Sequence, residues 1–241
     1  MKLKMLYSTK IDGNMSKNYD ETQNQYLINR KRFFYNNNIN IENTIVIDDM
    51  NSTDVIEIDE KFIFENKDLS KLEINTDCII TKIPNIFIYL PFGDCIPLAI
   101  LDTKQNIFAF AHLGWRSTEL NLHLKVIEKL KNEYNSKVED LEIIIGPSIK
   151  KESYVFKEPI QLNKNEWIPF LNQLKDGNYQ IDLNGYIIDG LTKIGINKIV
   201  NSEIDTAKDD RFFSHYKSVR TGEKEGRFIC GVMMEGSESF E

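Results

Sequence analysis

Hydrophobic residues recur along this chain at two spacings, one typical of strands and one typical of helices. Two apolar runs, residues 97–101 and 107–111, flank the polar and turn-forming residues 102–106. This pattern predicts two buried strands joined by a short loop. Other short apolar or β-branched runs predict further strands, at residues 1–8, 44–47, 55–58, 78–81, 86–90, 141–145, 198–200 and 228–234.

Apolar residues three, four or seven positions apart predict helices between these strands. A helix is expected at residues 20–36, where Asp20 and Gln23 resemble a capping box. A second should run from Ser117 or Thr118 to about residue 132, and residues 158–174 should be partly helical. The apolar positions that define the helical faces are Leu27 with Phe34, Ile28 with Tyr35, the set Leu120, Leu124, Ile127 and Leu130, and the set Leu183, Ile187, Leu191 and Ile194, which Gly195 ends.

Strands and helices alternate over the whole length, without an internal repeat or a Pro- or Ser-rich linker. We therefore expect one mixed α/β domain over residues 1–241, with its strands between helical layers. No Gly-rich phosphate loop of the mononucleotide or dinucleotide type is present in the sequence.

Composition narrows the classes of protein to which the chain can belong. The net charge is −7 and the pI is near 5.2, which argues against a nucleic-acid or anionic-membrane partner. No apolar run is long enough to span a bilayer, and the first ten residues lack the apolar core of a signal peptide. The cysteines at 78, 95 and 230 form neither a disulfide framework nor a zinc-type pattern. We expect a soluble cytoplasmic protein with reduced thiols, in which Cys78 and Cys230 belong to the core.

Cys95 and His112 are the strongest candidates for chemistry. Cys95 precedes the first strand of the predicted pair and His112 ends the second, so antiparallel pairing would bring the two side chains together. A thiol beside an imidazole can form a nucleophile, or it can supply two ligands of a metal site. The alternatives are a small buried hydrophobe for the cysteine and a histidine satisfied by a backbone carbonyl.

Other polar candidates carry weaker signals. Arg116 follows Gly114 and Trp115 and could contact an anion such as phosphate, although a surface ion pair explains it equally well. Arg30 and Arg227 rank below it. His123 is expected on a flank or solvent face of its helix, and His215 is expected to be a hydrogen-bonded packing residue.

Several segments, taken together, resemble the bacterial laccase-domain proteins. This family has been called multicopper polyphenol oxidoreductases and is regarded as purine nucleoside phosphorylases with adenosine deaminase activity. Asp94-Cys95 followed by His112-Leu113-Gly114-Trp115-Arg116 is the most specific match. The other matching segments occur in the family's order, at residues 13–16, 29–30, 76–81, 146–149, 153–154, 182–183, 212–215 and 226–227.

The resemblance implies a single-domain four-layer α/β/β/α sandwich with mixed sheets. It also implies a cleft in which one cysteine and two histidines bind zinc or copper. Cys95 matches the family cysteine and His112 the second histidine. The first histidine belongs to a Val-His-Gly type segment, and Asn51 stands in its place here. An amide oxygen is a poor zinc ligand, so metal binding through Cys95 and His112 should be weak or absent. Asp48 or Asp49 could supply a carboxylate.

Three functions remain open. The first is phosphorolysis of adenosine or inosine, with phosphate as co-substrate, Cys95 and His112 as catalytic residues, Asn51 and Arg116 contacting substrate, and possible deamination of adenosine. The second is a non-catalytic relative that binds a nucleoside or a protein partner, as the replacement at Asn51 suggests. The third is a copper-dependent polyphenol oxidase, which we rank last because one cysteine and three histidines cannot furnish several copper centres.

Overall fold

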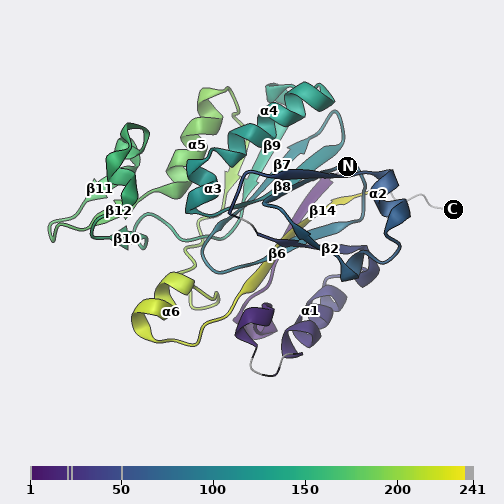
Figure 1. The fold of residues 1–241 in the computed structure, drawn as a ribbon, viewed down its shortest axis with the longest axis horizontal. Helices are drawn as coiled ribbons and strands as arrows, with labels where there is room; N and C mark the ends of the chain where they lie inside the picture. Colours follow the sequence, from purple (N-terminus) through teal and green to yellow (C-terminus); the bar gives the residue numbers. More distant parts are fainter. Residues whose placement is uncertain (1, 21, 23, 50, 237–241) are drawn as a thin grey trace.

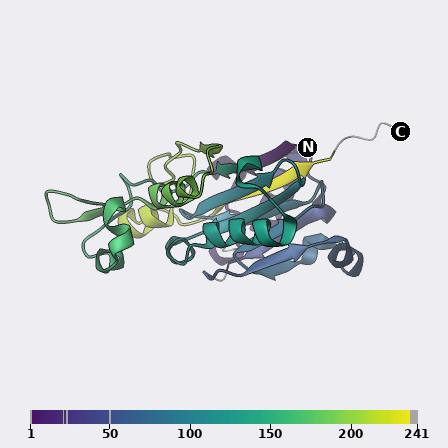
Figure 2. The same ribbon diagram turned by 90° about the horizontal axis from the view of Figure 1, so that it is seen from above.

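Two β-sheets lie face to face and carry helices on their outer sides (Figures 1 and 2). The computed structural model describes residues 2–20, 22, 24–49 and 51–236. The first sheet has the strand order β1 (Lys2–Tyr7), β14 (Phe228–Glu235), β6 (Phe87–Phe92), β2 (Thr44–Asp48) and β4 (Glu73–Asn75). The second has the order β13 (Ile199–Asn201), β9 (Leu141–Ile145), β7 (Ile96–Asp102), β8 (Ile107–Leu113), β5 (Cys78–Thr81) and β3 (Val55–Ile58).

Both sheets combine parallel and antiparallel pairs, as the predicted mixed sheets require. In the first sheet β2 runs parallel to β4 and β6, whereas β14 is antiparallel to β1 and β6. In the second, β3 runs parallel to β5, and β9 runs parallel to β13. The pairs β5–β8, β8–β7 and β7–β9 are antiparallel. A third, small sheet contains β10 (Val155–Phe156), β12 (Tyr179–Ile181) and β11 (Leu171–Gln173).

The α-helices are α1 (Gln25–Asn36), α2 (Glu60–Glu65), α3 (Trp115–Glu119), α4 (Leu122–Tyr134), α5 (Leu183–Lys193) and α6 (His215–Thr221). Helix α1 covers the outer face of the first sheet, and α4 and α5 cover the outer face of the second. The 3₁₀ helices are η1 (Lys10–Asp12), η2 (Lys17–Tyr19), η3 (Ile41–Asn43), η4 (Leu69–Lys71), η5 (Val138–Asp140), η6 (Ile160–Asn163) and η7 (Asn165–Phe170). Among the residues that the structure describes, no helix is both long and apolar enough to cross a membrane.

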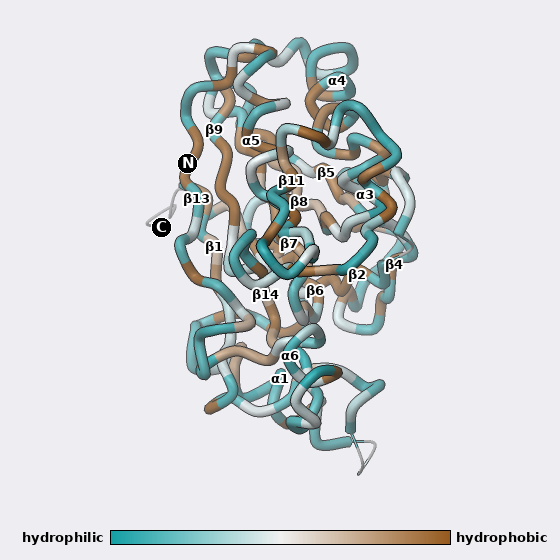
Figure 3. The backbone as a smooth tube through the Cα atoms, turned by 90° about the vertical axis from the view of Figure 1, so that its left-hand side faces the viewer, coloured by the Kyte–Doolittle hydropathy of each residue, from teal (hydrophilic) through white to brown (hydrophobic). Residues whose placement is uncertain are grey.

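Alternation along β8 shows how the layers are joined. Ala109 and Ala111 pack toward the helices α4 and α5, and Phe108 and Phe110 pack into the space between the sheets. Successive strand residues point to opposite faces, so a strand that is apolar on both faces lies between two cores. A third cluster joins α1 to the first sheet through Phe34, Phe87 and Tyr89. These clusters separate four layers and confirm the predicted α/β/β/α architecture; hydrophobic stretches follow the strands in Figure 3.

The first helix differs from the prediction in its start and in its buried face. It begins at Gln25, and Asp20 accepts a hydrogen bond from the Tyr26 backbone N–H at 2.8 Å. The predicted partner Gln23 lies outside the described residues. Leu27, Ile28 and Tyr35 are exposed, so the apolar stripe was wrong at these positions. The buried residues of this helix are Asn29, Arg30, Phe33 and Phe34. Asn29 and Arg30 can face inward because they donate hydrogen bonds to the backbone carbonyls of Asn14 and Met15.

The helix predicted after Trp115 is two helices. α3 starts at Trp115, not at Ser117 or Thr118, and the chain turns at Asn121, which adopts a left-handed φ of 58°. The turn rotates α4, so that Leu120 is exposed and His123 is fully buried. The expectation that His123 lies on a flank or solvent face was therefore wrong. Residues 160–163 and 165–170 are 3₁₀-helical and the segment then becomes β11, which agrees with the prediction that residues 158–174 are partly helical.

Candidate functional site

Cys95 and His112 meet where β7 begins and β8 ends. The two strands pair antiparallel, with Ile96 opposite Leu113 and Pro97 opposite His112, as the sequence predicted. A methyl group built on Gly114 would lie 3.4 Å from Cys95 Sγ, 3.5 Å from His112 Cε1 and 3.3 Å from Asn51 Oδ1. The sulfur, the imidazole and the amide therefore surround one point, and the backbone at Gly114 comes close enough that a side chain there would crowd them.

Asp77 orients the imidazole. Its Oδ1 lies 2.9 Å from His112 Nδ1, and its Oδ2 accepts hydrogen bonds from the Ser52 N–H at 2.6 Å and the Ser52 hydroxyl at 3.0 Å. A carboxylate at Nδ1 places a proton on that nitrogen and leaves Nε2 for chemistry. Sequence reasoning did not single out Asp77, because an aspartate before a buried strand carries no signal by itself.

Burial and charge act in opposite directions on this pair. Burial alone would lower the pKa of His112, but the neighbouring Cys95 sulfur and the carboxylates of Asp77 and Asp49 outweigh it and raise that pKa to about 10. Burial would raise the pKa of Asp77, yet the hydrogen bonds from His112 and Ser52 lower it overall. Both shifts favour a charged imidazolium–carboxylate pair.

A cavity of about 670 Å³ opens beside these residues, at the ends of β2 and β6. Cys95, His112 and Asn51 line it, together with the aromatic side chains of Trp115, Tyr154, Phe156 and Tyr216. Crevices at the carboxyl ends of parallel strands are common ligand sites, and β2 and β6 are parallel neighbours here. The other two cysteines lie elsewhere: Cys78 and Cys230 are fully buried core residues, as predicted.

The cationic side chains along the cavity are not those ranked first from the sequence. Arg30, Arg220 and Arg227 line it, with Lys17 and His215. His215 is exposed and hydrogen-bonds Glu225, so it is not a packing residue. Arg116 is exposed and stands over the Trp115 ring at 4.7 Å, outside the cavity lining in the described part of the chain. Its proposed contact with an anion remains a prediction.

Comparison with known proteins identifies the family. Residues 8–235 match the family described as multi-copper polyphenol oxidoreductase laccase. The chain belongs to this family. Among curated relatives, it is 28% identical over 172 residues to the purine nucleoside phosphorylase of Clostridium acetobutylicum, a match covering 70% of this chain and 71% of that protein. It is 26% identical over 166 residues to the purine nucleoside phosphorylase of Bacteroides thetaiotaomicron, covering 66% of this chain and 60% of that protein.

Solved structures of similar proteins share the laccase-family fold. The Bacillus licheniformis protein YfiH superposes with a TM-score of 0.84 at 21% identity, over 97% of this chain and 93% of the other. YlmD from Geobacillus stearothermophilus gives a TM-score of 0.84 at 18% identity, over 97% and 92%. Similarity at this identity establishes the architecture alone.

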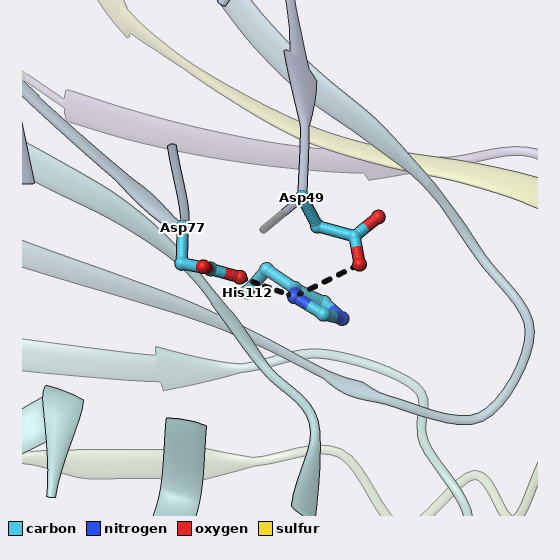
Figure 4. A group of neighbouring side chains, drawn as sticks. All are labelled: Asp49, Asp77 and His112. Atoms are coloured by element: carbon cyan, nitrogen blue, oxygen red, sulfur yellow. Dashed lines mark hydrogen bonds and ion pairs between the residues drawn. The ribbon is translucent and has the colours of Figure 1, made fainter. Parts of the chain in front are cut away.

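The name of the matching family implies a metal site. Asp49, Asp77 and His112 offer ligand atoms within 4.8 Å of one another, which makes metal binding chemically possible (Figure 4). However, Asp77 is already bonded to His112 Nδ1 and to Ser52. The Asp49 carboxylate lies 3.8 Å from His112 Nδ1, the nitrogen that Asp77 already holds. This leaves His112 Nε2 and Cys95 Sγ as the strong donors, beside the weak amide oxygen of Asn51. A tight zinc site needs three strong ligands in fixed geometry. This set does not fit one.

Proposed function

We propose that this protein is a purine nucleoside phosphorylase that cleaves adenosine or inosine with phosphate to give the free base and ribose 1-phosphate. The observation that carries the proposal is the shared cavity, in which Cys95 and His112 lie beside aromatic and cationic side chains. Aromatic rings suit a purine, and arginines suit phosphate. The relatives named purine nucleoside phosphorylase support the same reaction.

His112 is proposed as the proton donor to the departing base. A phosphate oxygen attacks C1′, the bond from C1′ to the purine nitrogen breaks, and its electron pair stays on the purine. The imidazolium Nε2 then donates a proton to the purine, while Asp77 stabilises the ring's charge and orientation. General acid catalysis of this kind contributes a factor of roughly 10²–10⁴ to the rate. Cys95 and the Asn51 amide are proposed to contact the substrate at the same point.

One assay separates this function from its alternatives. Purified protein is incubated with adenosine or inosine, with and without phosphate, and base, ribose 1-phosphate and ammonia are quantified. Phosphate-dependent base release that is lost in Cys95→Ala supports the proposal, and ammonia from adenosine would add deamination. Saturable nucleoside binding without turnover would instead support the non-catalytic relative to which Asn51 points.

A further inference from the structure

Arg30 on α1 is a buried cation for which no carboxylate partner occurs among the described residues. Only 8% of its surface is exposed, and it lines the cavity that holds Cys95 and His112. Its Nε donates to the Met15 carbonyl at 2.8 Å and its Nη1 donates to the Tyr89 hydroxyl at 3.4 Å. The guanidinium also stands over the rings of Tyr26 and Tyr89, at 4.9 and 5.4 Å. All of these partners are neutral.

The other cations of the cavity are compensated or exposed. Lys17 pairs with Glu73 at 2.8 Å, and Arg227 pairs with Glu225 at 3.0 Å. Arg220 is exposed, stacks on the Tyr216 ring at 3.4 Å and donates to the Val155 carbonyl. Burying a charge without a counter-charge is unfavourable. Arg30 is therefore the position along this lining where a bound anion would relieve the largest imbalance.

The geometry also fixes the shape of that anion. A guanidinium has five N–H donors in a rigid planar fork. Two groups of this chain accept from Arg30, and no further acceptor is found within the described residues. The Met15 carbonyl, itself in a fully buried residue, holds Nε in place. A fixed fork with free N–H groups at a cavity wall matches the paired oxygens of a phosphate group.

We infer that Arg30 forms a phosphate-binding subsite at the α1 end of the cavity. Its partner Tyr89 lies on β6, the strand whose Phe92 packs against the His112 ring at 5.7 Å between centroids, so one strand spans the anion site and the chemistry (Figure 1). Two phosphates share this chemistry: inorganic phosphate, the co-substrate of the proposed function, and the phosphate of a nucleotide. The choice of inorganic phosphate rests on the proposed function, but phosphate binding can be measured without turnover.

Calorimetric titration of the protein, in the absence of nucleoside, would measure binding of inorganic phosphate in one arm and adenosine 5′-monophosphate in the other. We expect millimolar or tighter binding in at least one arm. Arg30→Lys keeps the charge but loses the fork, so affinity should fall tenfold or more, and Arg30→Gln should lower it by roughly 10²-fold. Arg32→Gln is the matched control, because Arg32 lies on the same helix, is exposed and donates to the Asp12 carbonyl.

A second measurement does not depend on the stability of the variants. In wild-type protein labelled with ¹⁵N-arginine, phosphate should shift the Arg30 side-chain resonance, assigned by its loss in Arg30→Lys. No saturable binding in either arm, or equal binding by the Arg30 and Arg32 variants, would overturn the inference. Arg30-dependent binding without phosphorolysis would keep the subsite and refute the proposed function. Phosphorolysis with an unchanged KM for phosphate in Arg30→Lys would keep the function and refute the subsite.

Discussion

At the scale of single residues, Asp77 determines what the imidazole can do. It is fully buried, and it holds His112 Nδ1 on one oxygen and Ser52 on the other. Removing its charge leaves His112 without the carboxylate that fixes its tautomer and supports its positive form. The same geometry raises the pKa of the buried His112 imidazole above its usual value.

We expect Asp77→Asn to lower phosphorolysis by roughly 10²–10⁴-fold, because the imidazole can then adopt the wrong tautomer. The pKa of His112, about 10 in the native protein, should fall. That pKa lies above the unfolded value of 6.5, so the stability that the raised His112 pKa contributes is fully present below pH 6.5 and is lost as pH rises through 10. Turnover and NMR titration of the His112 ring measure these effects. Asp54→Asn is the control, since exposed Asp54 bonds Ser52 but not His112; equal behaviour of the two variants would contradict the assignment.

Asn51→His should restore a third strong ligand and raise zinc affinity at least tenfold, which corresponds to about 1.4 kcal/mol. Asn51 has a left-handed φ of 51°, and histidine is among the residues that tolerate this region, so the backbone can accept the change. Metal content after equilibration with zinc and dialysis is the readout. Asn106→His is the control, because Asn106 has a similar φ of 49° but lies in the turn between β7 and β8. One tightly held zinc or copper per wild-type chain would refute the view that the native site is incomplete.

The site was partly predictable at this scale. Cys95 and His112 could be paired because strand ends and antiparallel pairing are visible in the apolar pattern. Arg116 could not be placed, because its side chain turns onto Trp115 through a stacking contact that spacing does not encode. Arg30 ranked low and Asp77 was not singled out, because the contacts that distinguish them, with Tyr89 and with His112, reach across the fold.

At the scale of elements, the break between α3 and α4 has the largest effect. The left-handed turn at Asn121 rotates α4 and buries His123 against α5, where a methyl group on Gly190 would lie 3.0 Å from Nε2. Neither ring nitrogen of His123 has a hydrogen-bond partner among the described residues. A single asparagine between Leu120 and Leu122 does not signal such a turn, which is why a continuous helix was predicted.

His123 should therefore make the protein sensitive to acid. Burial lowers the pKa of His123 from 6.5 to about 4, so the unfolded chain takes up a proton before the native state does. Native stability should fall as pH drops from 6.5 towards 4, by roughly 3 kcal/mol from this residue. In His123→Leu this component should disappear, as measured by urea unfolding at neutral and acidic pH. An acid dependence identical to that of wild type would exclude His123 as its source.

At the scale of the whole molecule, the four layers follow from strands that are apolar on both faces. β7 and β8 are buried at every position, and this could be read from the continuous apolar runs. The assignment of other strands to the first or second sheet could not be read in this way, since β2 and β14 reach their neighbours through long connections. The buried faces of the outer helices could not be read from the sequence either, because the buried face of α1 contains the polar residues Asn29 and Arg30.

The layers also predict how the three thiols respond to alkylation. Cys78 and Cys230 are fully buried and burial raises the pKa of both thiols, whereas half-buried Cys95 faces the cavity. Iodoacetamide should modify Cys95 alone in the native protein and all three thiols in denaturant, as mass spectrometry of peptides would show. Adenosine or inosine should protect Cys95. Native labelling of Cys78 or Cys230 at a comparable rate would contradict the buried placement.

The two hydrogen bonds from Ser52 to Asp77 limit what a change at residue 51 can disturb. Asp77 accepts hydrogen bonds from both the main-chain N–H and the hydroxyl of Ser52. The main-chain bond does not depend on the side chain at residue 51, so the loop keeps this contact when residue 51 changes. Residue 51 can thus exchange an imidazole for an amide while the His112 ring keeps its orientation. A substitution at residue 51 would therefore change the donor atoms beside Cys95 without releasing the proposed proton donor from Asp77.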